Sequence, residues 1–190
     1  SVGVYRSLLD ASVSAAQQLS TAHDIAKFGS WPETAREELL EMFRVMDEIT
    51  MRIYFAAGAD NDGTTAATTP ERTRFYSEIR PLLEKLADVM AVHVAHYLIQ
   101  TLEALVPIDP PGVFELIARS VKASEKVGYT AESMAADVIV RIVERYLADH
   151  RDVFADRARL NDLMDCLDAF VRAGWPAAQA LTFRLGEIWR

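Results

Sequence analysis

The stretch Val127-Gly128-Tyr129-Thr130-Ala131 has a counterpart in Ala173-Gly174-Trp175-Pro176-Ala177, at an offset of about 46 residues. In each copy a glycine and an aromatic residue stand between two apolar patterns of helical period. Glycine commonly ends a helix because it adopts the left-handed conformation without steric cost. Each copy therefore predicts a joint between two helices. An offset of this size is typical of repeated helix pairs, so the sequence predicts a helical array.

The correspondence continues on both sides of the joint. Upstream, Phe114, Ile117, Ala118 and Val121 match Leu160, Leu163, Met164 and Leu167; downstream, Met134, Ile139 and Ile142 match Ala180, Leu185 and Ile188. Over about residues 110–190 this pattern resembles HEAT and armadillo repeats. The resemblance implies a scaffold that offers an extended surface to partner proteins, and it brings no catalytic residue with it.

The rest of the chain also has helical periodicity, and no segment shows sustained two-residue alternation with β-branched residues. We predict a first helix that ends at Gly29, and a second from about Pro32 to Ala57 that Gly58 ends. Ser30 and Glu33 have the spacing of a capping box at the start of the second helix.

A third helix starts at Pro70, and Pro81 should break or kink it because proline lacks an amide donor. A new helix then spans Leu82 to Leu105, and Asp109 should cap the next one. We expect an all-α protein of about eight helices. Residues 1–106 would form a bundle of longer helices or degenerate repeats, and residues 107–190 two HEAT-like antiparallel pairs, packed together as one domain.

Composition restricts the classes of function. The chain has 190 residues, of which 51% are hydrophobic, so it can bury a sizeable core. Its 28 acidic and 20 basic residues give a net charge of -8, which disfavours binding to nucleic acid. Cys166 has no partner for an internal disulfide, and no signal peptide or membrane span is visible. We expect a cytoplasmic protein without a membrane partner. The chain starts at Ser1 and not at methionine, which indicates a processed product, a tag remnant or an excised domain, and we expect an excised domain. Residues 113–190 resemble C-terminal helical regions of large bacterial multidomain proteins, which implies that the domain is a C-terminal part of such a protein.

His93 and His96 are three residues apart and lie on one side of the helix predicted for Leu82 to Leu105. Two such imidazoles can share a metal ion, but a zinc site needs three or four ligands and a di-iron bundle needs glutamates three residues before each histidine. Neither set is present. The surrounding apolar residues indicate a buried helix, so we interpret both histidines as hydrogen-bonded core residues. We predict no metal and no cofactor.

Two acidic segments resemble parts of known metal sites. Residues 161–168 are similar to the aspartate-rich motif of isoprenoid and terpene synthases, but Asn161 replaces the first acid and no second metal-binding segment follows. We interpret Asp162, Asp165 and Asp168 as a solvated face. Asp60-Asn61-Asp62-Gly63 resembles the start of an EF-hand loop, and Glu71 stands at the twelfth position. Residues 64–70 supply no carboxylate, however, and Thr65 replaces the glycine of the sixth position, so we interpret the segment as a flexible loop.

These observations predict a non-enzymatic scaffold or protein-interaction module. Its partner would be a protein, either other domains of the parent chain or another subunit, with a homo-oligomer as one possibility. The candidate interaction surface lies on the last helix and comprises Phe183, Ile188 and Trp189. The alternative is a small-molecule-sensing bundle whose pocket runs along the Leu82 to Leu105 helix. The candidate lining residues of that pocket are His93, His96, Tyr97 and Gln100.

Overall fold

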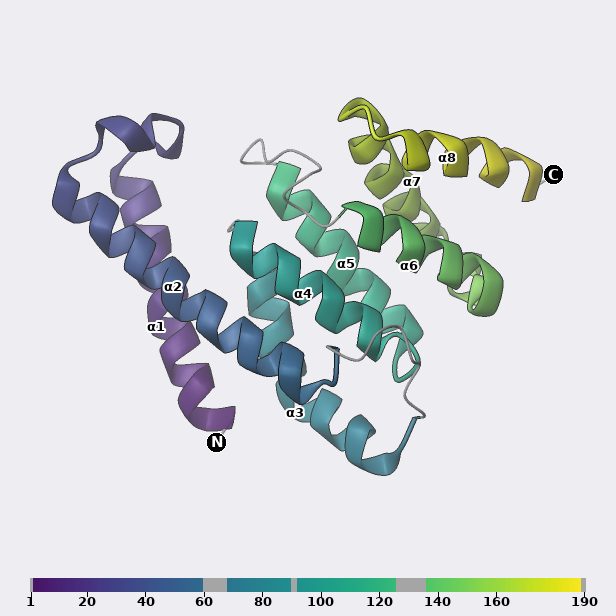
Figure 1. Ribbon diagram of the computed structural model, residues 1–190, viewed down its shortest axis with the longest axis horizontal. Coiled ribbons are helices and arrows are strands. Elements are labelled where there is room, and N and C mark those ends of the chain that lie inside the picture. Colours follow the sequence, from purple (N-terminus) through teal and green to yellow (C-terminus); the bar gives the residue numbers. More distant parts are fainter. Residues whose placement is uncertain (1, 60–67, 90–91, 126–135, 189–190) are drawn as a thin grey trace.

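A computed structural model describes residues 2–59, 68–89, 92–125 and 136–188. None of these residues lies in a β-strand, so the predicted all-α class is confirmed for the described chain. The eight described α-helices and two 3-10 helices (η) are shown in Figure 1. Their bounds are α1 Val2–Ala22, η1 Ile25–Ser30, α2 Glu33–Ala56, α3 Pro70–Ala87, α4 Val92–Leu105, α5 Pro110–Glu125, α6 Ala136–Asp149, η3 Arg151–Ala155, α7 Arg157–Arg172 and α8 Pro176–Ile188.

The helices stack in two layers. α1, α3, α5 and α7 follow one another in the first layer, and α2, α4, α6 and α8 in the second, because each helix contacts the helix two further along the chain. Figure 1 shows the second layer in front of the first. Helix pairs that stack on their neighbours produce contacts of this kind. The specific assignment to HEAT or armadillo repeats stays a prediction, and so does the boundary after residue 106.

One end of the stack is an arm, which we define as α1, η1 and α2. Its two long helices pack against each other, and its tip projects past the ends of α3 and α4 (Figure 1). Leu9, Leu39 and Met46 are fully buried in its interior. The arm joins the stack because α1 contacts α3 and α2 contacts α4.

Two predicted boundaries in the arm are wrong. α1 ends at Ala22 and not at Gly29, because the chain turns where Trp31 packs. The Trp31 ring lies 4.9 Å from the His23 ring, and its Nε1 donates to the Asp24 carbonyl at 2.7 Å. The expected capping box is also absent. Ser30 Oγ donates instead to the carbonyl of Lys27 at 2.8 Å.

The start of a new helix at Leu82, predicted after a break or kink at Pro81, is wrong as well. α3 continues through Pro81 to Ala87, and the described part of α4 spans Val92–Leu105. An interior proline costs a helix about 3 kcal/mol. Burial on both sides of it offsets that cost, because apolar side chains before and after the proline face the core. These are Tyr76, Ile79, Leu82, Leu83 and Leu86.

Other helix ends follow the sequence. Gly58 and Gly174 have φ of 69° and 80°, as the predicted glycine stops require. At Gly174 the amides of residues 174 and 175 bond back to the carbonyls of Val171 and Phe170, both at 2.9 Å, which is the Schellman arrangement. Asp109 caps α5 by accepting the Gly112 amide at 3.1 Å. The joint at 127–131 and the loop at 60–63 lie outside the described residues.

Candidate functional site

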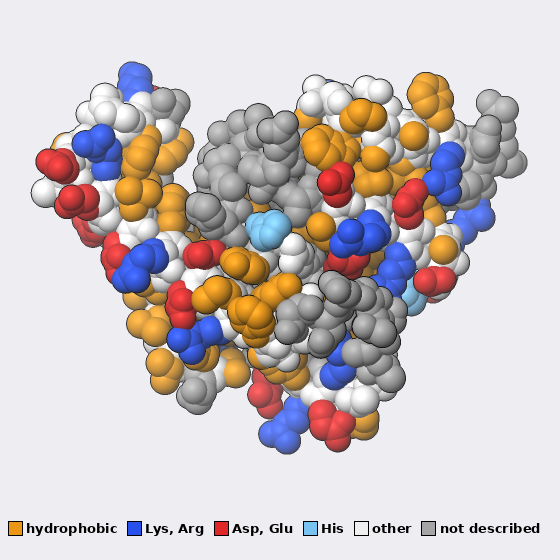
Figure 2. All heavy atoms as spheres, viewed as in Figure 1, with side chains coloured by type: hydrophobic (Ala, Val, Ile, Leu, Met, Phe, Trp, Pro, Cys, Tyr) orange, Lys and Arg blue, Asp and Glu red, His pale blue; other side chains and the backbone are white. Residues whose placement is uncertain are grey.

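The face of α2 and α4 carries a row of aromatic side chains, which we call the aromatic ridge. Its members are Phe55, Tyr54, Tyr97 and His96, and successive ring centroids are 5.2, 5.3 and 5.6 Å apart. Figure 2 shows hydrophobic side chains gathered where the C-terminal half of α2 meets α4. The ridge therefore joins two neighbouring helices of the second layer on an accessible face.

The ridge exists because each helix buries its opposite side. On α4, Val94, Leu98 and Ile99 are buried, which leaves His96 exposed and Tyr97 half-buried. On α2, Ile53 is buried while Phe55 is 56% exposed. Tyrosine rings that are partly buried and partly accessible supply contact area at low entropic cost, and they are frequent in binding surfaces.

The structure overturns our interpretation of His96 as a core residue. His96 is exposed, and its Nε2 lies 3.0 Å from Nε2 of Gln100, one turn further along α4. The prediction of a core position rested on the apolar residues close to His96 in the sequence. In the structure, residue 96 lies on the side of α4 opposite its buried residues. The side chain of His93 lies outside the described residues.

The prediction that these residues line a pocket stays a prediction. His96, Tyr97 and Gln100 do lie together on α4, as their spacing requires. Sequence reasoning missed Tyr54 and Phe55, which α2 brings to the same place. Two adjacent aromatics near the end of an amphipathic helix were the available signal, because only one of two consecutive positions can face the core.

A separate, concave feature lies beside the arm. A cavity of about 490 Å³ opens between the arm and the C-terminal end of α3, and we call it the arm groove. Its volume is within the range of about 300–1,000 Å³ that is usual for ligand sites. Its walls are Val13, Ala16, Gln17, Ser20, Thr21, Ile25, Phe43, Met46, Lys85, Asp88 and Val89.

The two charged side chains of the arm groove are paired with residues outside it. Lys85 forms an ion pair with Asp10 of α1, and this pair ties the arm to α3. Asp88 accepts a bidentate contact from Arg119 of α5, at 2.5 and 3.1 Å. Both charges therefore hold helices together, and the remaining walls are mainly apolar.

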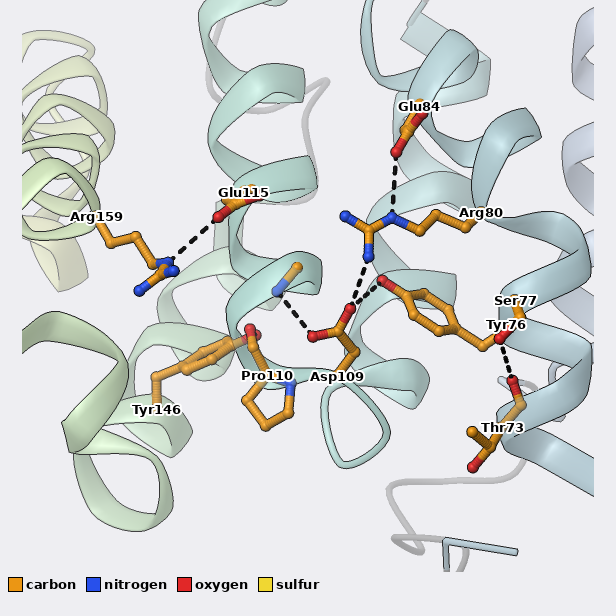
Figure 3. A network of polar contacts seen from close by, with 11 residues as sticks. Thr73, Tyr76, Ser77, Arg80, Glu84, Asp109, Pro110, Glu115, Tyr146 and Arg159 are labelled. Carbon is orange, nitrogen blue, oxygen red and sulfur yellow. Dashed lines mark hydrogen bonds and ion pairs between the residues drawn. The ribbon is translucent and has the colours of Figure 1, made fainter. Parts of the chain in front are cut away.

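A polar network joins α3 to the start of α5 (Figure 3). Asp109 Oδ2 accepts the Tyr76 hydroxyl at 2.9 Å and Arg80 Nη1 at 3.0 Å. Burial, with a further contribution from the hydrogen bond to Asp109, raises the pKa of Tyr76. The Tyr146 hydroxyl donates to the Pro110 carbonyl at 2.6 Å, and burial raises its pKa also. No group of this network faces the arm groove, so we assign it to stability.

The aspartate segment of α7 is engaged by a lysine. Lys122 Nζ of α5 lies 2.5 Å from Asp162 and 3.4 Å from Asp165. Asp165 and Asp168 are exposed, as the solvated-face interpretation requires, whereas Asp162 is half-buried in this contact. Lys122 thus contacts both carboxylates, and this contact joins α5 to α7.

On α8, Phe183 is 81% exposed, while Leu181 and Leu185 are buried. The side chain of Ile188 and the whole of Trp189 lie outside the described residues. The predicted surface on the last helix is therefore described only at Phe183, where a large apolar ring is in contact with solvent.

We compared the chain with protein-family models, curated proteins and solved structures, and none of them matches it. No helix in the described part of the chain is both long and apolar enough to cross a bilayer. Within the same part, no three His, Cys, Asp or Glu side chains gather closely enough to hold a metal ion. The site is therefore interpreted from its own geometry.

Proposed function

We propose that this protein is a non-enzymatic helical scaffold that binds other proteins, and that the aromatic ridge is its main contact surface. The observation that carries the proposal is the row Phe55, Tyr54, Tyr97 and His96 across two helices. Stacked helices present side chains from successive units side by side, so a partner can contact several helices at once. Aromatic residues are enriched among the side chains that dominate binding energies.

Charge supports a protein partner over a nucleic acid. The net charge of -8 repels phosphate backbones, and several of the described arginines form ion pairs between helices. Arg141 pairs with Glu103 at 2.7 Å and Arg184 with Glu144 at 2.8 Å. Such pairs link α4 to α6 and α6 to α8 and leave no continuous basic stripe at these positions.

A display selection of random peptides on the full chain tests this proposal. Peptides that are enriched should bind at least about tenfold more weakly to Phe55→Ser, since removing a hot-spot aromatic costs more than 1.4 kcal/mol. The control is Met164→Ser on α7, a helix that packs against α5 and α8, where the side chain is 37% exposed. If both variants lose peptide binding equally, or if neither loses it, the aromatic ridge is not the contact surface.

The second candidate is the small-molecule-sensing bundle. It is favoured by the volume of the arm groove and by three of its lining residues, Lys85, Asp88 and Val89, which fall in the segment Leu82 to Leu105 along which the pocket was expected. Screening the full chain by thermal shift against a panel of small apolar amphiphiles tests it. Saturable stabilisation by one compound, absent in Ser20→Trp, would support sensing over scaffolding.

A further inference from the structure

We propose that the N-terminal half of α2 is a dimer interface, and that its partner is a second copy of this chain, paired antiparallel through the same helix. The inference goes beyond the proposed function, because it does not involve the aromatic ridge. Three observations support it: an open face on α2, two buried polar atoms without partners, and a spacing that makes this face complementary to itself.

The open face of α2 lies beyond the start of α4. Tyr97 of α4 packs against Tyr54 of α2, with ring centroids 5.3 Å apart, and the two helices run in the same direction (Figure 1). The described part of α4 begins at Val92, one and a half turns before Tyr97, so it begins level with about residue 49 of α2. The part of α2 before this level therefore projects past α4, and Leu40 on it is 55% exposed.

Four residues of this part follow one line along the helix, which we call the α2 stripe: Arg36, Leu40, Phe43 and Asp47. Steps of four, three and four residues keep their side chains within an arc of about 60° around the helix axis. Leu40 is exposed and Phe43 is half-buried, so apolar side chains lie at the centre of the stripe. The α2 stripe thus has an apolar centre and one charged residue at each end.

The charged ends of the α2 stripe have polar atoms without partners. Arg36 Nε and Asp47 Oδ1 are buried, and neither forms a hydrogen bond within the described chain. Buried polar atoms are almost always paired, so each exception needs a physical reason. Here the donor lies at one end of the stripe and the acceptor at the other, about three turns or roughly 16 Å apart. They are too far apart to bind each other within one copy.

The spacing makes the α2 stripe complementary to itself. Positions 36 and 47 have the same midpoint as positions 40 and 43, between residues 41 and 42. A two-fold axis through that midpoint, in an antiparallel pairing, places Arg36 opposite Asp47 of the second copy and Leu40 opposite its Phe43. The same contacts recur with the two copies exchanged. One interface therefore brings a partner to both charged ends and covers the apolar centre of each stripe.

The chemistry of the paired ends fits this arrangement. An arginine fork donates through Nε and one Nη to both oxygens of a carboxylate. Arg36 and Asp47 are only partly buried as whole residues, so their side chains can turn toward the second copy. The contact would then satisfy the two atoms that the single copy leaves unpaired.

Charge distinguishes a second copy from other partners. An anionic lipid surface or an acidic segment would bind Arg36 and leave Asp47 unpaired, and a basic segment would do the reverse. Another protein would need an acid and a base three turns apart around an apolar centre, whereas the second copy has them by symmetry. Because one helix stripe is a small interface, we expect a Kd in the micromolar range.

Complementary charge reversals test the pairing in the full chain. All proteins carry Phe183→Glu, so that association through α8 does not contribute. Arg36→Asp should weaken the dimer at least about tenfold, and so should Asp47→Arg, because each change alone places like charges opposite each other. An equimolar mixture of the two should recover the parent affinity to within about threefold, since both ion pairs form between unlike copies. Sedimentation equilibrium measures each case.

The matched control is Glu38→Lys, a charge reversal at an exposed position about 200° around the helix from residue 36. It should change the Kd less than about twofold. Circular dichroism and thermal melts check that every variant keeps its fold. Folded single variants that dimerise like the parent, or a mixture that stays monomeric, would overturn the assignment of this interface.

A cross-linking experiment tests the antiparallel register. Leu40→Cys and Phe43→Cys proteins are oxidised with diamide, separately and mixed, while the native Cys166 is buried. The mixture should form its disulfide-linked pair faster than either protein alone, because residues 40 and 43 face each other across the two-fold axis. Faster linkage between two Leu40→Cys copies would show a different register and contradict the inference. A parent that stays monomeric at all concentrations would also overturn it, while the proposal for the aromatic ridge would stand.

Discussion

The carboxylate of Asp109 occupies the space into which a side chain at Gly112 would project. Asp109 Oδ1 accepts the Gly112 amide at 3.1 Å, and an added Cβ at residue 112 would lie 2.9 Å from Asp109 Cγ and closer still to Oδ2. The carboxylate cannot turn away freely, because Tyr76 and Arg80 also bind it. A single glycine therefore permits the network that joins α3 to α5.

Gly112→Ala should destabilise the protein by about 1–3 kcal/mol, because it displaces a carboxylate that three donors hold. Helix propensity alone predicts the opposite sign, since alanine is favoured over glycine by about 1 kcal/mol inside a helix. Urea denaturation measures the difference. Gly29→Ala is the control, because nothing lies within 4 Å of a Cβ there, and it should change stability by less than about 1 kcal/mol. A stabilised Gly112→Ala protein would contradict the packing argument.

Gly174→Ala should cost about 1–2 kcal/mol, because residue 174 has φ of 80° and L-residues are strained in that region. No atom lies within 4 Å of a Cβ at this position, so the cost would come from backbone conformation and not from a clash. A thermal melt checks it, and an unchanged melting temperature would show that the α7–α8 joint can adopt another conformation. The same change at Gly128 tests the predicted counterpart joint.

Stability should fall above about pH 10, where tyrosines of the unfolded chain ionise. The folded pKa of Tyr76 is raised because the phenol is buried and donates to Asp109. A raised folded pKa means that its contribution is present below the unfolded pKa and is lost as the pH rises. Denaturation at pH 8 and pH 11 measures the loss. It should be smaller in Tyr76→Phe than in the wild type, and an equal loss would remove Tyr76 as the cause.

The isolated chain should associate with itself as its concentration rises, because Phe183 is 81% exposed on α8. Sedimentation velocity measures this association. Phe183→Glu should weaken the association, whereas Gln179→Glu adds the same charge at another exposed position of α8 and should leave association largely unchanged. A wild type that stays monomeric at all concentrations would exclude this surface as a site of self-association.

The sequence by itself determined the features that depend on local chemistry. Helical periodicity predicted the all-α class, the positive φ of Gly58 and Gly174 followed from their places after apolar patterns, and Asp109 caps α5 as expected. These features depend on a few neighbouring residues. Backbone sterics and the unpaired amides at a helix start act over one turn, so a single sequence contains the information.

Tertiary packing decided the rest. It ended α1 at Ala22 because Trp31 packs there, and it kept α3 continuous through Pro81 because both sides of the proline are buried. It also placed His96 on the surface and brought Tyr97 against Tyr54 from a helix more than 40 residues away in the chain. The aromatic ridge and the arm groove depend on which helix faces meet. That choice follows from burying the apolar surface of the whole chain, and no local pattern contains it.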